Sequence, residues 1–424
     1  MNHIVRRCAV RGTLLFIVVI LGFATLSSNP LKGELAAIWR RNFVIAIQLW
    51  GRFTHQMDAQ TQLFLRTMRA SELGITRGDA KAVNWFYMAA TQNSVTAQRN
   101  LGLIYRNGRG LPQNDTEAAE RYRKAADQGD AVSQYKLWIL YYNGQGVPKD
   151  TIEGVKFLRK AADQGFAQAQ SDLGYVYESG IGVSQDSSEA GKWYRKAADQ
   201  GHAVAQNNLG ALLDKGRGMP RNLPEAISWF TKSAEQGYPL AQMNLGSIYE
   251  TGHGVTKNLL EAFSLYHKAA DQGLALAQNS LASLYYDGRG VVQNRGEAAK
   301  WFRKAANQGL AGAQFNLGYV YFSGHGVPQD DDEAVAWWRK SADQDFAFAQ
   351  YYLGFMYFNG RGVPQDDAEL PNGTVRLRSK AWPRPKTPLA ASTPRVGVYR
   401  KTMPWRSGGI VRQSGLGWAR LRKI

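Results

Sequence analysis

The amino-acid sequence repeats itself every 36 residues, and eight copies align without a gap. Leucine fills one position of every copy, namely Leu101, Leu137, Leu173, Leu209, Leu245, Leu281, Leu317 and Leu353. Glutamine fills the position three residues earlier, namely Gln98, Gln134, Gln170, Gln206, Gln242, Gln278, Gln314 and Gln350. A short unit cannot bury its apolar side chains alone, so repeated units must stack on one another. The period therefore predicts a linear array of units.

The first half of each copy has the pattern of an amphipathic helix. In residues 169–179, for example, Ala169, Leu173 and Gly174 lie at positions i, i+4 and i+5, on one face of a helix. Glycine destabilises a helix, so its recurrence here indicates that another backbone approaches closely. The next glycine, Gly180, is expected to end the helix with a left-handed cap.

The second half of each copy begins with a helix-capping signal. The expected N-cap residues are Asn114, Asp150, Asp186, Asn222, Asn258, Asn294, Asp330 and Asp366. Glutamate follows three residues after each of them, which is the pattern of a reciprocal capping box. Each copy is thus predicted to form a hairpin of two helices, and the whole array to be all-α.

The repeat unit A-x-A-Q-x-x-L-G-x-x-Y-x-x-G-x-G-V-x-Q-D, followed by E-A-x-x-W-Y-R-K-A-A-D-Q-G, closely resembles the Sel-one-like repeat, a relative of the tetratricopeptide repeat. The resemblance covers residues 80–369. It implies a right-handed superhelical α/α solenoid whose concave face serves as a scaffold for protein complexes. Members of the family include exported bacterial proteins, and the fold implies no substrate.

The amino terminus has the features of an export signal. Arg6, Arg7 and Arg11 precede an uncharged and mostly apolar run at 13–26. We interpret residues 1–28 as a signal peptide or a signal anchor. Either alternative places the repeats on the non-cytoplasmic side, in a periplasmic or membrane-anchored protein. Residues 29–79 are expected to form a helical linker and a degenerate N-terminal cap.

The net charge of +18 lies almost entirely outside the repeats. Residues 370–424 hold 13 Lys and Arg and no acid, whereas residues 61–369 hold 32 basic and 32 acidic side chains. A neutral repeat body gives no support to nucleic-acid binding. The Arg-Lys pairs of the second helices are expected to form ion pairs with acids three residues later, as Lys124 would with Asp127.

No group of residues has the pattern of a catalytic, metal or cofactor site. The only cysteine is Cys8. His253 and His325 occupy the same loop position two repeats apart, too far to share a metal. The loop at Gly288, Arg289 and Gly290 lacks the third glycine and the βαβ setting of a phosphate-binding loop. The sequence therefore predicts a protein without enzymatic activity, cofactor or metal.

The repeat pattern stops after residue 369, where a basic, acid-free stretch begins. Codons permitted for residues 372–381, when read from the third base of the first, give Trp-Tyr-Arg-Lys-Ala-Ala-Glu-Gln-Gly, the missing second helix. The same shift turns residues 395–402 into Lys-Gly-Arg-Gly-Val-Pro-Gln-Asp. We interpret residues 370–424 as a frameshift product. The alternative is a genuine tail that binds nucleic acid or an anionic membrane.

The expected partner-binding residues come from helical period alone. Positions opposite the packing stripe carry polar side chains in the middle copies, such as Ser171, Glu178, Asn207 and Glu250. In the last two copies they carry aromatic rings, namely Phe315, Tyr319, Phe322, Tyr351, Phe355 and Phe358. We predict that these rings bind a protein partner on the concave face. The alternatives for these rings are that they pack between units, or that truncation has bared a surface that two further repeats once covered. The alternative for the chain as a whole is an accessory or inhibitory subunit of an envelope enzyme.

Overall fold

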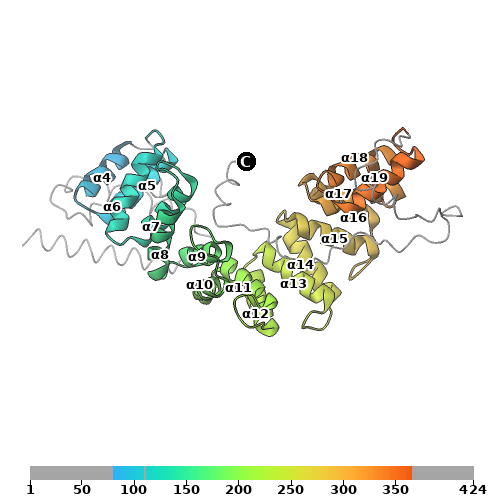
Figure 1. Ribbon diagram of the computed structural model, residues 1–424, viewed down its shortest axis with the longest axis horizontal. Helices are drawn as coiled ribbons and strands as arrows, with labels where there is room; N and C mark the ends of the chain where they lie inside the picture. The colour runs from blue at the N-terminus through green and yellow to red at the C-terminus, as the bar shows by residue number, and fades with distance from the viewer. Residues whose placement is uncertain (1–79, 109–110, 365–424) are drawn as a thin grey trace, which may run out of the picture. The chain divides into compact units, whose positions relative to one another are not determined.

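A computed structural model describes residues 80–108 and 111–364, and every regular element in these residues is an α-helix (Figure 1). The first helices of the hairpins are α5 (Val95–Asn107), α7 (Ala131–Asn143), α9 (Ala167–Ser179), α11 (Ala203–Lys215), α13 (Pro239–Thr251), α15 (Ala275–Asp287), α17 (Ala311–Ser323) and α19 (Ala347–Asn359). The second helices are α4 (Ala80–Thr91), α6 (Asp115–Asp127), α8 (Thr151–Asp163), α10 (Ser187–Asp199), α12 (Leu223–Glu235), α14 (Leu259–Asp271), α16 (Arg295–Asn307) and α18 (Asp331–Ala342).

The chain forms two compact units, one up to Gly154 and one from Val155 onward. Within each unit, helices that follow one another in sequence pack side by side, as α15 does with α16 and α16 with α17. The predicted all-α fold of 36-residue helical pairs is confirmed. The expected signal segment, the N-terminal cap and the basic tail lie outside the described residues.

The second helices begin at the predicted capping residues. In α16, for example, the side chain of Asn294 accepts a hydrogen bond of 2.9 Å from the Glu297 backbone N–H. Equivalent caps form at Asn114, Asp150, Asp186, Asn222, Asn258 and Asp330.

The reciprocal half of the capping box is not formed in the described hairpins. The Asn294 N–H donates instead to the carbonyl of Tyr285, 2.9 Å away in the preceding helix. The capping residue thus joins the two helices of its hairpin, and the following glutamate is left to other partners. Glu297, for instance, binds Lys300.

Glycine residues end every first helix in the left-handed region, as predicted. The caps are Gly108, Gly144, Gly180, Gly216, Gly252, Gly288, Gly324 and Gly360, with φ from 60° to 75°. The second glycine of each loop has an additional role in packing. At Gly290 a Cβ atom would lie 2.4 Å from the carbonyl oxygen of Leu259, at the start of the second helix of the preceding hairpin. Only glycine lets successive units approach this closely.

The glycine within the first helix makes room chiefly for an aromatic ring. A Cβ atom on Gly246 would lie 2.7 Å from Cε1 of Tyr266, a buried residue of the facing helix α14. Gly102, Gly174, Gly210 and Gly318 meet Tyr122, Tyr194, Phe230 and Trp338 in the same way. The expected close backbone is present at Gly210 and Gly318, where a Cβ atom would lie 3.1 Å from the carbonyl oxygens of Ala226 and Ala334, but the ring is the nearer neighbour at each of these glycines.

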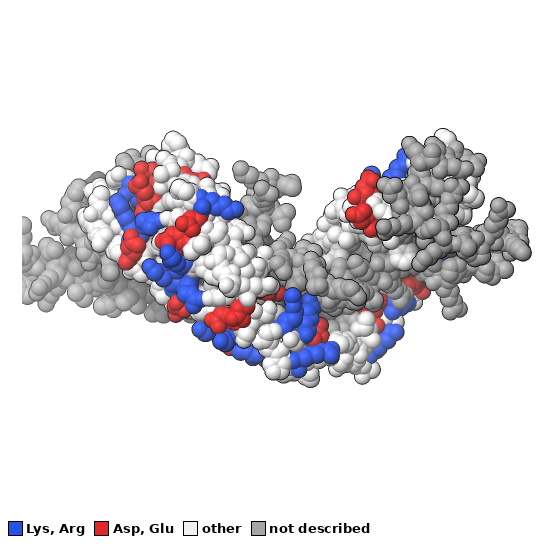
Figure 2. All heavy atoms as spheres, viewed as in Figure 1, with Lys and Arg blue, Asp and Glu red and all other residues white. Residues whose placement is uncertain are grey.

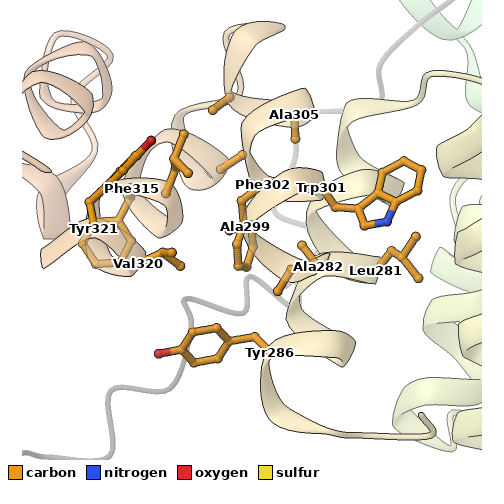
Figure 3. Close-up of a cluster of buried hydrophobic side chains, with 14 of the residues drawn as sticks. Leu281, Ala282, Tyr286, Ala299, Trp301, Phe302, Ala305, Phe315, Val320 and Tyr321 are labelled. Atoms are coloured by element: carbon orange, nitrogen blue, oxygen red, sulfur yellow. The ribbon is translucent and has the colours of Figure 1, made fainter. Parts of the chain in front are cut away.

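The core consists of clusters of buried aliphatic and aromatic side chains. Figure 3 shows one such cluster, in which Leu281 and Ala282 of α15, Phe302 of α16 and Phe315 of α17 are all fully buried. Burial of apolar surface, which stabilises by about 25 cal/mol per Å², is the main force that holds the packed helices together.

The repeated glutamine bonds two helices at once. Gln278 Nε2 donates to the Ala270 carbonyl at 3.1 Å, and Gln278 Oε1 accepts from Gln308 Nε2 at 2.8 Å. The same side-chain pair joins Gln98 to Gln128, Gln170 to Gln200, Gln206 to Gln236, Gln242 to Gln272 and Gln314 to Gln344. A buried amide needs such partners, which explains why glutamine recurs at this position.

Candidate interaction surface

The predicted aromatic residues lie on α17 and α19, but their environments differ. Phe315 is only 1% exposed. Its ring packs against those of Trp338, Phe346 and Tyr352, at centroid distances of 6.3, 5.5 and 5.6 Å. The prediction that Phe315 faces a partner is wrong, because the next first helix covers this position.

Three of the other predicted rings are partly exposed and contact neighbouring rings. Tyr319, Phe322 and Phe355 are half-buried. Tyr319 contacts Tyr352 edge-on at 6.2 Å, and Phe322 contacts Phe355 at 6.2 Å in the same geometry. These edge-to-face contacts hold the rings in fixed orientations.

The exposed rings of α19 lie near the two ends of the helix. Phe348 is 43% exposed and Phe358 is 63% exposed. Phe348, Tyr352 and Phe355 follow one another at i, i+4 and i+7 and so share a face of the helix. Together with Tyr319 these three residues form what we name the aromatic row. Phe358 does not belong to it and lies at the end of α19.

Two members of the aromatic row were not predicted from the sequence. Tyr352 is the central ring, with contacts to Phe315, Tyr319, Phe322, Trp338 and Tyr351. Burial, aided by the neighbouring tyrosines, raises the pKa of Tyr352 to about 12. Tyr352 lies one residue beyond the predicted Tyr351, and Phe348 lies one turn before Tyr352, outside the three positions considered in each helix.

In the middle of the array the predicted polar positions are also covered. Ser171, Asn207 and Glu178 are 2%, 3% and 5% exposed. Asn207 Oδ1 accepts a hydrogen bond of 2.9 Å from Asn244 on the following first helix. Asn207 therefore joins successive first helices, and the assignment of these three buried positions to an open groove was wrong.

A recurring contact links a first helix to the loop of the next hairpin, 39 residues later in the sequence. Glu250 Oε1 lies 2.7 Å from Nη1 of Arg289, and Glu250 Oε2 accepts a hydrogen bond of 2.9 Å from the Tyr266 hydroxyl. At the same two positions in other hairpins lie Glu178 and Arg217, Asp214 and His253, Tyr286 and His325, and Phe322 and Arg361. We name this the 39-residue contact.

Comparison of the sequence with models of known families finds repeats of the same length. The sequence model of the Sel1 repeat matches nine consecutive segments, at residues 58–94, 95–130, 131–166, 167–202, 203–238, 239–274, 275–310, 311–346 and 347–369. The chain belongs to the Sel1 repeat family. The first match begins inside the segment that we expected to be a linker and cap, so the family pattern adds a ninth copy to the eight found by self-comparison.

Two solved structures are similar to this Sel1 repeat protein. One is c5321, a protective antigen present in uropathogenic Escherichia coli strains and displaying an SLR fold. It is 36% identical with a TM-score of 0.70, and the match covers 76% of this chain and 69% of c5321. The other is a Sel1 repeat protein from Oxalobacter formigenes, 34% identical with a TM-score of 0.57, covering 73% and 89%. A comparison with curated proteins gives no match.

The histidines of the Sel1 units have structural partners. His253 lies 3.1 Å from Asp214, and His325 binds the Tyr286 hydroxyl at 2.7 Å, both through the 39-residue contact. Burial lowers the pKa of His202, which binds Gln168 at 3.0 Å and caps α11. Among the described residues no group of three or more His, Cys, Asp or Glu side chains could hold a metal.

The Arg-Lys pairs of the second helices have other partners than we predicted. Within the part of the chain that the structure describes, Lys124 and Asp127 form no ion pair. Lysines instead lie over tryptophan rings three residues earlier, as Lys304 does over Trp301 at 3.6 Å. Basic and acidic side chains are interspersed over the visible face of the described helices (Figure 2). Within the same residues no helix is long and apolar enough to span a membrane.

Proposed function

We propose that this Sel1 repeat protein is a non-catalytic scaffold that binds a protein partner through the first helices of its second unit. Sel1 repeats generally mediate protein–protein interaction. The aromatic row is the anchor of the proposed surface. The observation that carries the proposal is the 43% exposure of Phe348 beside the half-buried rings of Tyr352 and Phe355.

The physical properties of the aromatic row favour a binding role. Its rings are held from beneath by Phe315 and Trp338, which are almost completely buried. A partner would therefore gain apolar contact area without having to order these side chains. An apolar stripe with hydroxyl groups at Tyr319 and Tyr352 suits a partner segment that carries aliphatic or aromatic side chains beside exposed peptide groups.

Other features of the chain argue against a catalytic role. The carboxylates of Glu178 and Glu250 are engaged by tyrosine and arginine side chains of neighbouring elements. No nucleophile, base and orienting group stand together among the described residues. The neutral repeat body supports a protein partner rather than a nucleic acid.

Export is part of the same proposal. The basic residues and apolar run of segment 1–28 favour it, as does the similarity to c5321, which is described as a protective antigen. Cell fractionation and N-terminal sequencing of the mature protein test it. We expect the repeats in the periplasmic or membrane fraction, and recovery from the cytosol with residue 1 retained would exclude export.

Site-specific photo-cross-linking tests the binding surface. A photoreactive phenylalanine analogue is placed at Phe348 or Phe355, and at exposed Leu260 on α14 as the control. We expect one partner to be cross-linked from Phe348 and Phe355 and not from Leu260. Equal cross-linking from all three positions, or cross-linking from Leu260 alone, would contradict the proposed surface.

A further inference from the structure

The last first helix presents a surface that is covered at the equivalent position of the preceding one. Phe322 on α17 is half-buried, because Phe355 packs against it and the Arg361 guanidinium lies 4.6 Å from its ring centroid. The equivalent residue on α19 is Phe358, which is 63% exposed. The described residues end at 364 and contain no counterpart of Arg361 for Phe358, because the position 39 residues after Phe358 is 397.

We propose that this end of α19 is an interface between Sel1 units, and that the missing unit is encoded by the codons of residues 370–424 read one base out of frame. The Sel1 match to the last unit ends at residue 369, where the shift was inferred from the sequence. The structure adds a test that the codon argument did not use. Three contact rules specify which residue types the missing unit must carry, and at which positions.

The first rule concerns the ring that faces the glycine of each first helix. The ring lies twenty positions after the glycine, as Trp338 does after Gly318. For Gly354 on α19 the matching position is 374. The shifted frame, in phase with the array, places a tyrosine there, whereas this chain has Thr374.

The second rule concerns the paired glutamines. Gln314 is bound by Gln344, thirty positions later, at 2.8 Å. The equivalent partner of Gln350 falls at position 380, where the shifted frame reads glutamine and this chain has Lys380. Among the described residues, the side-chain oxygen of Gln350 accepts no hydrogen bond.

The third rule is the 39-residue contact itself. Phe322 pairs with Arg361, so Phe358 requires a cation at position 397. The shifted frame reads Gly-Arg-Gly at 396–398 and puts an arginine at that position, whereas this chain has Gly397. The observed residues fix two of the three bases of each shifted codon and permit all three required side chains. Thr374 lacks the ring and Gly397 lacks the cation that these rules require, and Lys380 has an ammonium group in place of the amide.

Sequencing the gene and restoring its frame test the proposal. The nucleotide sequence is expected to read tyrosine, glutamine and arginine at positions 374, 380 and 397 after one base is inserted near codon 370. A nucleotide sequence that gives other residues at these positions would overturn the proposal. The full chain is then compared with the chain in which that base has been inserted. The restored chain should gain helical circular dichroism, and the amides of α19 should exchange on the order of tenfold more slowly.

Variants of the contact itself decide whether the new unit covers α19. In the restored chain, Phe358→Ala and replacement of the arginine at position 397 by alanine should each lower the thermal midpoint. Phe358→Ala should leave the midpoint of the unrestored chain nearly unchanged. Val292→Ala, at an apolar loop residue that is 87% exposed, is the control and should have no effect in either chain.

Two results would contradict the proposal. One is a restored chain with no added helicity or with equal effects of Phe358→Ala in both chains. The other is that the unrestored chain forms dimers by sedimentation that Phe358→Ala dissociates, since a second copy would then be the occupant of this surface.

Discussion

The guanidinium carbon of Arg361 lies 4.6 Å from the ring centroid of Phe322, at the two positions where Arg289 and Glu250 form an ion pair in an earlier hairpin. One geometric contact is thus made by different chemistry along the array. The arginine is common to these two pairs while its partner changes from a carboxylate to a ring, and a histidine takes the place of the arginine in the contacts at His253 and His325. Stacking in a solenoid is a sum of such neighbour contacts.

Loss of one 39-residue contact should destabilise the array locally. Arg289→Ala removes the cation beside Glu250, whose side chain is only 13% exposed, and should lower the free energy of unfolding by about 1–3 kcal/mol. Urea denaturation followed by circular dichroism measures the effect. Lys192→Ala, which breaks an exposed ion pair with Glu189, is the matched control and should change stability by less than about 0.5 kcal/mol. Equal effects of the two variants would show that the 39-residue contact does not stabilise the stack.

The effect of replacing a helical glycine by alanine should depend on which atoms the added methyl group would contact. Gly246→Ala places a Cβ atom 2.7 Å from the Tyr266 ring and should cost about 1–3 kcal/mol, although alanine is the better helix former. Gly296→Ala meets nothing closer than 3.6 Å and should be neutral or stabilise by up to about 1 kcal/mol. Thermal denaturation of the two variants measures both effects. Stabilisation by Gly246→Ala would mean that the ring is free to move away.

Much of this fold could be predicted because the stacking contacts involve the same positions in every copy. The roles of Asn294 as a helix N-cap and of Gly288 as a left-handed C-cap follow from the residues next to them in the sequence. The ring that faces Gly246 could not be read in this way. Its partner Tyr266 is twenty residues away on another helix.

The candidate site was predicted less well than the fold. A first helix is contacted on several sides, so helical period alone does not tell which face is open. Phe315 was assigned to the surface although the next helix covers it, and Tyr352, one residue beyond the predicted position, is the central ring. The exposure of the other predicted rings depends on the neighbouring hairpin, which the pattern of a single helix does not contain.

Stability should fall at alkaline pH because of buried tyrosines. Burial raises the pKa of Tyr122, Tyr238, Tyr286 and Tyr352 to about 12, from a value near 10 in the unfolded chain. A raised folded pKa contributes stability that is fully present below pH 10 and is lost as pH rises from 10 to 12. Urea midpoints over this range, with phenolate absorbance, measure the loss. Tyr352→Phe should make the decline less steep, and an unchanged slope would show that Tyr352 ionises in the folded state.

The binding surface is tested most directly by the affinity of the cross-linked partner for a variant with an altered aromatic row. Phe348→Ala combined with Phe355→Ala should weaken binding, so that the dissociation constant measured by calorimetry rises on the order of tenfold or more. Helical circular dichroism should remain that of the parent chain, and Leu260→Ala should bind normally. Unchanged affinity in a folded double variant would contradict the account, because the partner would then bind elsewhere on the Sel1 array.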